Sequence, residues 1–93
     1  MEISIISNVT ISETTTMDNV KTQIKELVNN YFLELKKDWE NSETIIIRKA
    51  QIDTIILYAD GVIDVSNTSI NNKASNIELQ KFEIPILKEV TLI

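Results

Sequence analysis

The chain has 93 residues, of which 43% are hydrophobic and 25% are charged, and its formal net charge is −5. This length and composition are typical of one small globular domain and exclude a disordered chain. Nucleic-acid binding draws most of its affinity from clustered Lys and Arg, whereas the nine basic residues of this acidic chain are scattered, so nucleic acid is not an expected partner.

The first segment has the period of two that is typical of a strand with one buried face. Apolar residues occupy its odd positions, and Ser7 alone interrupts the row: Ile3, Ile5, Val9 and Ile11. A polar connection, residues 12–16, follows this strand. Its last residue, Thr16, is the expected N-cap of a helix.

From Met17 the apolar spacing changes to three and four residues, which predicts a long amphipathic helix. Its apolar stripe consists of Val20, Ile24, Leu27, Val28, Tyr31, Phe32, Leu35 and Trp39. We expect this stripe to pack on the domain's own sheet, because a helix must first bury its apolar face within its own fold. Docking of a partner helix on the stripe is the alternative.

A short extended segment and a second helix come next. Residues 44–47 are β-branched throughout, which favours an extended conformation. The second helix is expected to begin near Ala50. Its buried stripe is Ile52, Ile55, Ile56 and Ala59. A helix this short depends on tertiary contacts for its stability.

The only glycine of the chain, Gly61, follows this helix and is expected to have a positive φ. The expected geometry places Asp60 at the helix cap and Gly61 in the left-handed conformation. Val62 is then expected to fold back onto Leu57.

The last third of the chain has the pattern of three short strands. After the glycine, Ile63 and Val65 are expected on one face of a strand. Asparagine tolerates positive φ, so a hairpin turn is predicted at residues 71–74, leading to a strand over 77–80. Pro85 marks an irregular or edge position. A last strand over 88–93 completes the pattern.

The order of elements, β-α-α-β-β-β, predicts an α+β fold. The expected architecture is a two-layer sandwich, in which two helices pack on one face of a mostly antiparallel sheet of three to four strands. Residues 1–93 are expected to form a single domain.

The residue types limit the chemistry that this domain can perform. With no cysteine and no histidine, the chain lacks thiolate chemistry, serine–histidine pairs and the usual zinc ligands. Three carboxylates, Asp53, Asp60 and Asp64, surround the glycine turn, but their spacing matches no calcium loop. We therefore expect no catalytic, metal or cofactor site.

Two aromatic residues are candidate interface anchors, because Tyr and Trp dominate binding hot spots. They are Tyr58, which lies off the apolar stripe of its helix, and Trp39 at the end of the long helix. Completion of the core is the alternative role for both. The chain start lacks the features of a signal peptide, and no apolar run approaches the ~20 residues that span a bilayer, so a cytoplasmic domain without membrane contact is expected.

The segment from Ile47 to Ile52 and on through Ala59 to Val65 combines a short extended piece, a helix, and Gly61-Val62-Ile63-Asp64 leading into a strand. In this it resembles the C-terminal region of the baseplate J-like, or XkdT-like, family. The chain end, with Glu83-Ile84-Pro85-Ile86-Leu87 and Glu89-Val90-Thr91-Leu92, resembles the family's closing motifs. The chain departs from the family pattern at Asp60, where proline is common, and at Asn71-Asn72, where glycine is usual.

The resemblance implies a structural role without catalysis, as the C-terminal domain of a longer wedge protein in the baseplate of a contractile phage or prophage tail. It implies wedge, hub and tail-fibre attachment proteins as partners, and assembly in the bacterial cytoplasm. The isolated domain is expected to be a monomer or a weak dimer. The alternative is a stand-alone α+β module that binds a protein or ligand on its open sheet face.

Overall fold

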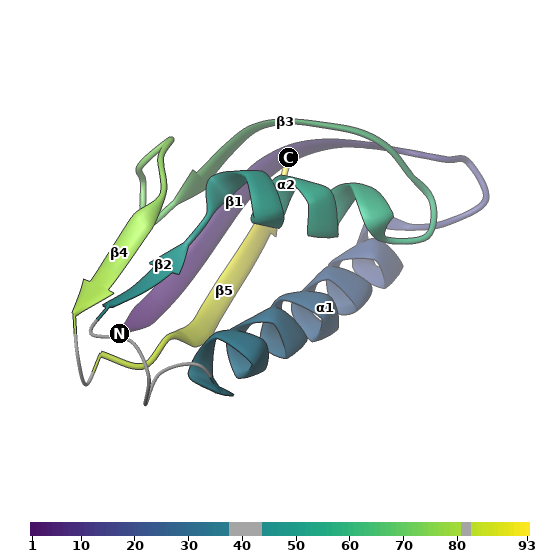
Figure 1. Cartoon of the computed structure of the whole chain (residues 1–93). Coiled ribbons are helices and arrows are strands. Elements are labelled where there is room, and N and C mark those ends of the chain that lie inside the picture. Colours follow the sequence, from purple (N-terminus) through teal and green to yellow (C-terminus); the bar gives the residue numbers. More distant parts are fainter. Residues whose placement is uncertain (38–43, 81–82) are drawn as a thin grey trace.

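Five strands and two helices make up the part of the chain that the computed structural model describes, which is residues 1–37, 44–80 and 83–93. The elements, labelled in Figure 1, are β1 (Glu2–Ile11), α1 (Met17–Lys37), β2 (Thr44–Ile47), α2 (Lys49–Tyr58), β3 (Val62–Ile70), β4 (Ile77–Gln80) and β5 (Ile86–Leu92). The two helices, their starts at Met17 and near Ala50, and the short extended segment between them agree with the sequence prediction.

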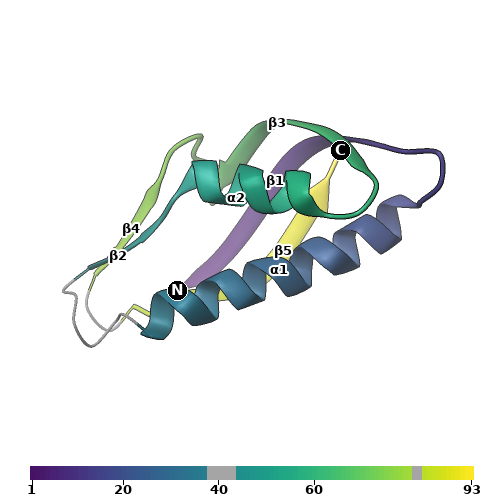
Figure 2. The ribbon, with the colours of Figure 1, turned by 45° about the vertical axis from the view of Figure 1, so that its right-hand side comes forward.

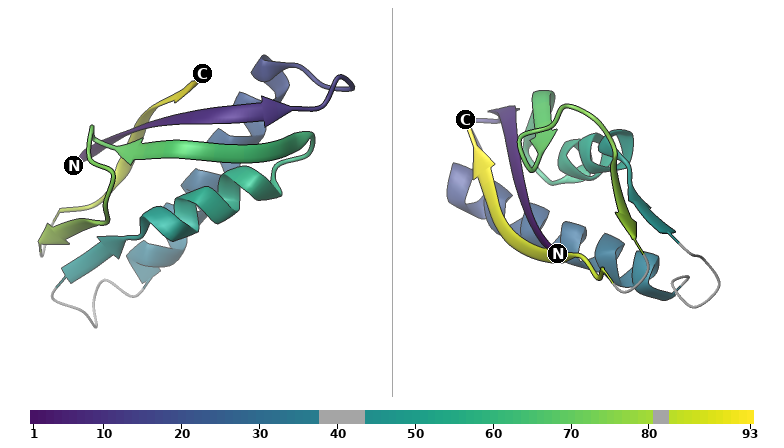
Figure 3. Two further views of the ribbon diagram at one scale, coloured as in Figure 1. Left: turned by 90° about the horizontal axis from the view of Figure 1, so that it is seen from above. Right: turned by 90° about the vertical axis from the view of Figure 1, so that its left-hand side faces the viewer.

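The strands form two ladders. The larger sheet has the order β3-β1-β5, in which β1 pairs antiparallel with β3 and parallel with β5. The smaller ladder joins β2 and β4 antiparallel and extends from one end of the molecule (Figure 3). Both helices lie on the same side of the larger sheet (Figures 1 and 2). The predicted α+β class, with two helices packed against a mostly antiparallel sheet, is confirmed.

The core lies between the helices and the inner face of β1. Ile3 and Ile5 are fully buried there, as the period of two predicts. The helices bury the predicted stripes against this face. The buried residues are Val20, Ile24, Val28 and Phe32 from α1, Ile52 and Ile56 from α2, and Ala59 directly after α2. Each of the buried Val, Ile and Phe side chains contributes about 1.5–3 kcal/mol.

The smaller ladder depends on the same core. Ile45, Ile47 and Leu79 are buried and belong to the core cluster. A two-stranded ribbon is marginally stable on its own in water, so this inner row of side chains holds the ladder to the domain.

The start of α1 follows the prediction, because the Asn19 N–H donates to Thr16 Oγ1 at 3.2 Å. This is the N-cap bond that satisfies one of the free amides of the first turn. Near the other end, Leu35 is partly buried against the core. Trp39 lies outside the described residues.

Two β-bulges in β3 change the predicted faces of that strand. In the first, Asn67 and Thr68 together lie opposite Ser7 of β1, and Asn67 has a φ of 53°. In the second, Ile63 is the extra residue. The expectation that Ile63 and Val65 share a face is therefore wrong: Val65 packs against the core, whereas Ile63 is 63% exposed.

A tight turn follows β3, but the strand after it does not pair with β3, so the predicted hairpin is not formed. Ile70 and Lys73 exchange both backbone hydrogen bonds, at 2.9 and 3.0 Å, around Asn71 and Asn72, whose φ angles are 50° and 65°. Two positive φ angles define a type I′ turn, which asparagine tolerates. After this one bridge the chain leaves β3, because β4 pairs with β2 instead.

Asn71 also extends the larger sheet. Its N–H donates to the Ser4 carbonyl at 2.8 Å, and its Oδ1 accepts from the Ser4 N–H at 2.8 Å. The amide nitrogen of its side chain donates to the Glu2 carbonyl at 3.2 Å. Glycine would allow the turn but could not make the two side-chain bonds.

The first bulge encloses a polar pair inside the core. Ser7 and Thr68 are 0% and 1% exposed, and their hydroxyl oxygens are 2.8 Å apart. Ser7 Oγ also donates to the Ser66 carbonyl at 3.3 Å. Ser7, which breaks the apolar row in the sequence, thus continues the buried face as a hydrogen-bonded residue.

Removing one hydroxyl of this pair should destabilise the domain by more than the loss of a single hydrogen bond. We expect Ser7→Ala and Thr68→Val each to lower the free energy of unfolding by about 1–3 kcal/mol, because each leaves a buried hydroxyl without its partner. The double variant should lose less than the sum of the two. Urea denaturation measures all three, and Ser69→Ala on the opposite face is the control, expected within about 0.5 kcal/mol of the parent. Additive losses would show that the hydroxyls do not depend on each other.

Candidate functional site

The turn after α2 is built around a glycine, but its geometry differs from the expected helix cap. Helix α2 ends at Tyr58, and Ala59 is the C-cap with φ −61° and ψ 139°. The Val62 N–H donates to the Ala59 carbonyl at 3.2 Å and closes a four-residue turn. Gly61 is its third residue at φ +88°, and Asp60 is not among the residues with positive φ, which makes this a type II turn. The prediction that Asp60 caps the helix is therefore wrong.

The same turn is fixed to the connection between β1 and α1. The Ser12 N–H donates to the Gly61 carbonyl at 2.7 Å. A Cβ at Gly61 would lie 2.5 Å from Thr15 Cγ2 and 3.1 Å from Thr15 Cβ. Glycine is thus required here for its backbone conformation and for the close approach of Thr15.

The end of α2 carries exposed apolar side chains. Tyr58 is 79% exposed and Leu57 is 50% exposed, whereas Val62 packs against the core. An aromatic side chain this exposed makes few contacts within its own domain, and tyrosine is enriched in binding hot spots. Tyr58 is therefore the sequence candidate that the structure leaves available for a partner. The other candidate, Trp39, lies outside the described residues.

A groove beside Tyr58 separates α1 from the end of α2. We call it the helix-end groove, and its volume is about 200 Å³. It is lined by Gln23, Glu26, Leu27, Tyr58, Ala59 and Asp60. The Asp60 N–H donates to Gln23 Oε1 at 3.1 Å, so a hydrogen bond joins the two walls. The α1 side of this groove was missed in the sequence, where Gln23 and Glu26 have the pattern of ordinary solvent-facing residues.

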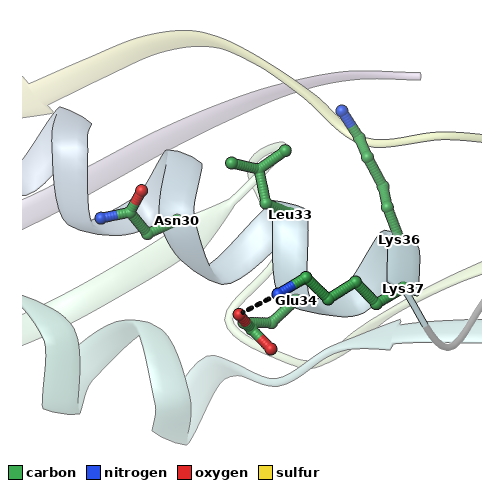
Figure 4. Close-up of a pocket in the computed structure, with 5 residues that line it drawn as sticks. All are labelled: Asn30, Leu33, Glu34, Lys36 and Lys37. Carbon is green, nitrogen blue, oxygen red and sulfur yellow. Dashed lines mark hydrogen bonds and ion pairs between the residues drawn. The ribbon is translucent and has the colours of Figure 1, made fainter.

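A wider hollow of about 590 Å³ lies on the second half of α1, but its described lining comes from that helix alone. Figure 4 shows its residues: Asn30, Leu33, Glu34, Lys36 and Lys37. Lys37 Nζ and Glu34 Oε1 pair at 3.0 Å, with both side chains largely exposed. A surface that one convex helix provides cannot enclose a ligand, so we assign no site to it.

The three carboxylates that surround the glycine turn in the sequence do not converge on one site. Asp53 pairs with Lys49 at 3.0 Å, and Asp64 Oδ1 accepts from the Val65 N–H at 2.9 Å. Asp60 lines the helix-end groove. Within the described ranges, no three acidic residues come together in a way that could hold a metal ion. No helix in these ranges is long and apolar enough to cross a membrane.

Comparison with known proteins relates nearly the whole chain to one family. The family model described as the baseplate J-like protein C-terminal domain matches residues 3–93. The chain is 34% identical over 92 residues to protein XkdT of the phage-like element PBSX of Bacillus subtilis strain 168. It is 32% identical over 92 residues to YqbT of the same strain. Each alignment covers 99% of this chain, which spans about a quarter of the length of these curated relatives.

Replacing Gly61 should destabilise the domain for two separable reasons. We expect Gly61→Ala to cost about 1 kcal/mol for the positive φ. The contact with Thr15 should add about another 1 kcal/mol, as overpacking does. A Thr15→Ala background removes the 2.5 Å contact with Cγ2 but keeps Cβ at 3.1 Å, so most of the second cost should disappear, and urea denaturation of the four proteins measures the difference. Equal costs in both backgrounds would show that Thr15 does not restrict this turn.

Proposed function

The chain belongs to the baseplate J-like protein C-terminal domain family, and from this membership we propose that it is a structural assembly domain of a phage or prophage tail baseplate. The observation that carries the proposal is the family match over residues 3–93, supported by the similarity to a protein of the phage-like element PBSX. Its task is to hold neighbouring proteins in place.

The domain is proposed to act as the C-terminal part of a longer wedge protein. Its coverage of only a quarter of each relative supports this placement. The partners are then other baseplate proteins, namely wedge and hub subunits and tail-fibre attachment proteins. The parent protein would assemble in the bacterial cytoplasm and remain in the baseplate of the finished particle.

We assign the domain no catalytic role. The sequence has no histidine or cysteine to act as base or nucleophile. Two of the three acidic residues around the glycine turn are engaged within their own elements, as a helix ion pair and a local backbone contact. Scaffold function requires none of this chemistry.

A binding module that uses the outer sheet face is a weaker candidate. That face carries mainly short polar side chains of β1, such as Ser4, Asn8 and Thr10. The helix-end groove, with its exposed tyrosine, is better suited to a specific contact. We therefore place the contact surface at the end of α2 rather than on the sheet.

The isolated chain should be a monomer or a weak dimer. Its apolar core is buried within the domain, and the exposed large apolar residues of the described part, such as Leu33, Tyr58 and Ile63, come from different elements. A stable interface usually buries at least about 1,200 Å². In a particle, many weak contacts add up because they are held together by other domains. Multi-angle light scattering checks this expectation, and stable hexamers of the isolated chain would contradict it.

Loss of the domain should prevent formation of normal baseplates. Electron microscopy of tails whose wedge protein lacks this region gives the test, with the intact wedge protein as the control. Detached or incomplete baseplates are expected. Normal baseplates without the region would remove the proposed function.

A further inference from the structure

The helix-end groove has the size of a receptor for one side chain. Its volume is about 200 Å³, whereas small-molecule sites usually enclose roughly 300–1,000 Å³. Its two walls are joined by the hydrogen bond from the Asp60 N–H to Gln23 Oε1. The turn that carries Asp60 is itself tied to residue 12 through the Gly61 carbonyl. The fold therefore shapes this groove before any partner arrives.

The lining of the groove suits a long side chain with an aliphatic stem. Leu27 and Ala59 contribute apolar surface, and Tyr58, which also lines the groove, is largely exposed. An aliphatic stem packs on such surface while its charged head stays in contact with water. A cationic head is also attracted to the face of an aromatic ring. Lysine and arginine combine these two features.

The charge of the groove is uniformly acidic. Glu26 and Asp60 line it, and none of its described lining residues is basic. Elsewhere the chain pairs carboxylates with its own lysines: Glu34 with Lys37, Asp53 with Lys49, and Glu2 with Lys88. Within the described residues, neither Glu26 nor Asp60 forms an ion pair. Among the described residues, no lysine or arginine of the chain neutralises this groove, which leaves it open to a cation from another molecule.

We infer that the helix-end groove receives an arginine side chain from a neighbouring tail protein. Arginine fits better than lysine because its planar guanidinium carries five donors, which can serve two carboxylates at once while stacking on an aromatic ring. This inference rests on the proposed function, since it names the chemistry of one contact in the baseplate. It assigns Glu26, Asp60 and Tyr58 as the residues that recognise the partner.

A titration with a minimal probe tests the recognition step. N-acetyl-arginine amide, added to the isotopically labelled chain, should shift the backbone amide signals of residues 23–27 and 58–60 in NMR spectra. The matched probe, N-acetyl-citrulline amide, has nearly the same shape but no charge. It should bind about tenfold more weakly, because hydrogen bonds to charged groups are stronger than neutral ones. Equal shifts from both probes, or arginine shifts scattered over the surface, would overturn the inference.

Matched variants connect the binding to the named residues. Glu26→Gln and Asp60→Asn keep the shape of each side chain and should each weaken binding of the arginine probe about tenfold. Glu34→Gln removes a carboxylate from the same helix outside the groove and should leave the affinity unchanged. A loss with Glu34→Gln equal to the loss with Glu26→Gln would show a general charge effect and overturn the assignment. Dispersed NMR spectra of each variant establish that it is folded.

A second copy of the chain is the competing source of the arginine. The chain has one arginine, Arg48, and it is exposed at the start of α2. Association that grows with protein concentration and disappears in both Arg48→Gln and Glu26→Gln would place the arginine on a second copy. That result would overturn the assignment to a neighbouring protein.

The assembled particle distinguishes this inference from the proposed function. Full-length parent protein carrying Glu26→Lys and Asp60→Lys together should fail to form normal baseplates, whereas Glu34→Lys should form them. Normal baseplates with the double variant, combined with failure on deletion of the whole region, would overturn only the groove inference. Normal baseplates in both cases would overturn the proposed function as well.

Discussion

The pairing of β1 with a strand on each side is the constraint on which the rest of the structure depends. β1 is central in the larger sheet, antiparallel to β3 and parallel to β5. Its buried face is the surface on which both helices pack. Because β5 lies far from β1 along the chain, the three-stranded sheet is complete only after these two distant segments have paired. Such long-range pairing carries a large loop-closure entropy, which the buried isoleucines of β1 must offset.

The sequence predicted the elements well because each has a clear period. The spacing of apolar residues identifies β1, α1 and α2, and Thr16 marks the helix start through its side-chain oxygen. The bulges of β3 were not predictable in this way. A bulge is a property of two strands together, and neither Ile63 nor Asn67 differs in pattern from a regular strand residue. The same reason explains the missing hairpin, since the partner of β4 is β2.

The candidate site was predictable in part. Tyr58 and the glycine turn stand out in the sequence, because one lies off its helix stripe and the other holds the only glycine. The opposite wall of the helix-end groove did not stand out. Glu26 comes from another helix, far away along the chain, and its role depends on a packing geometry that periodicity does not encode. The sequence therefore indicated Tyr58 and Asp60 but not Glu26, which supplies the second carboxylate of the groove.

The parallel alignment of β1 and β5 also determines how the domain responds to mechanical load. The pairs run from Glu2 with Ile86 to Ser7 with Leu92, with one register shift between Ile3 and Ser4, and the two chain ends lie at opposite ends of this ladder (Figure 1). A tension applied between Met1 and Ile93 would therefore slide the two strands along each other. In this shearing geometry the hydrogen bonds between them bear the force together, instead of opening one after another as in a zipper. A domain built in this way transmits a pull through its sheet as a rigid link.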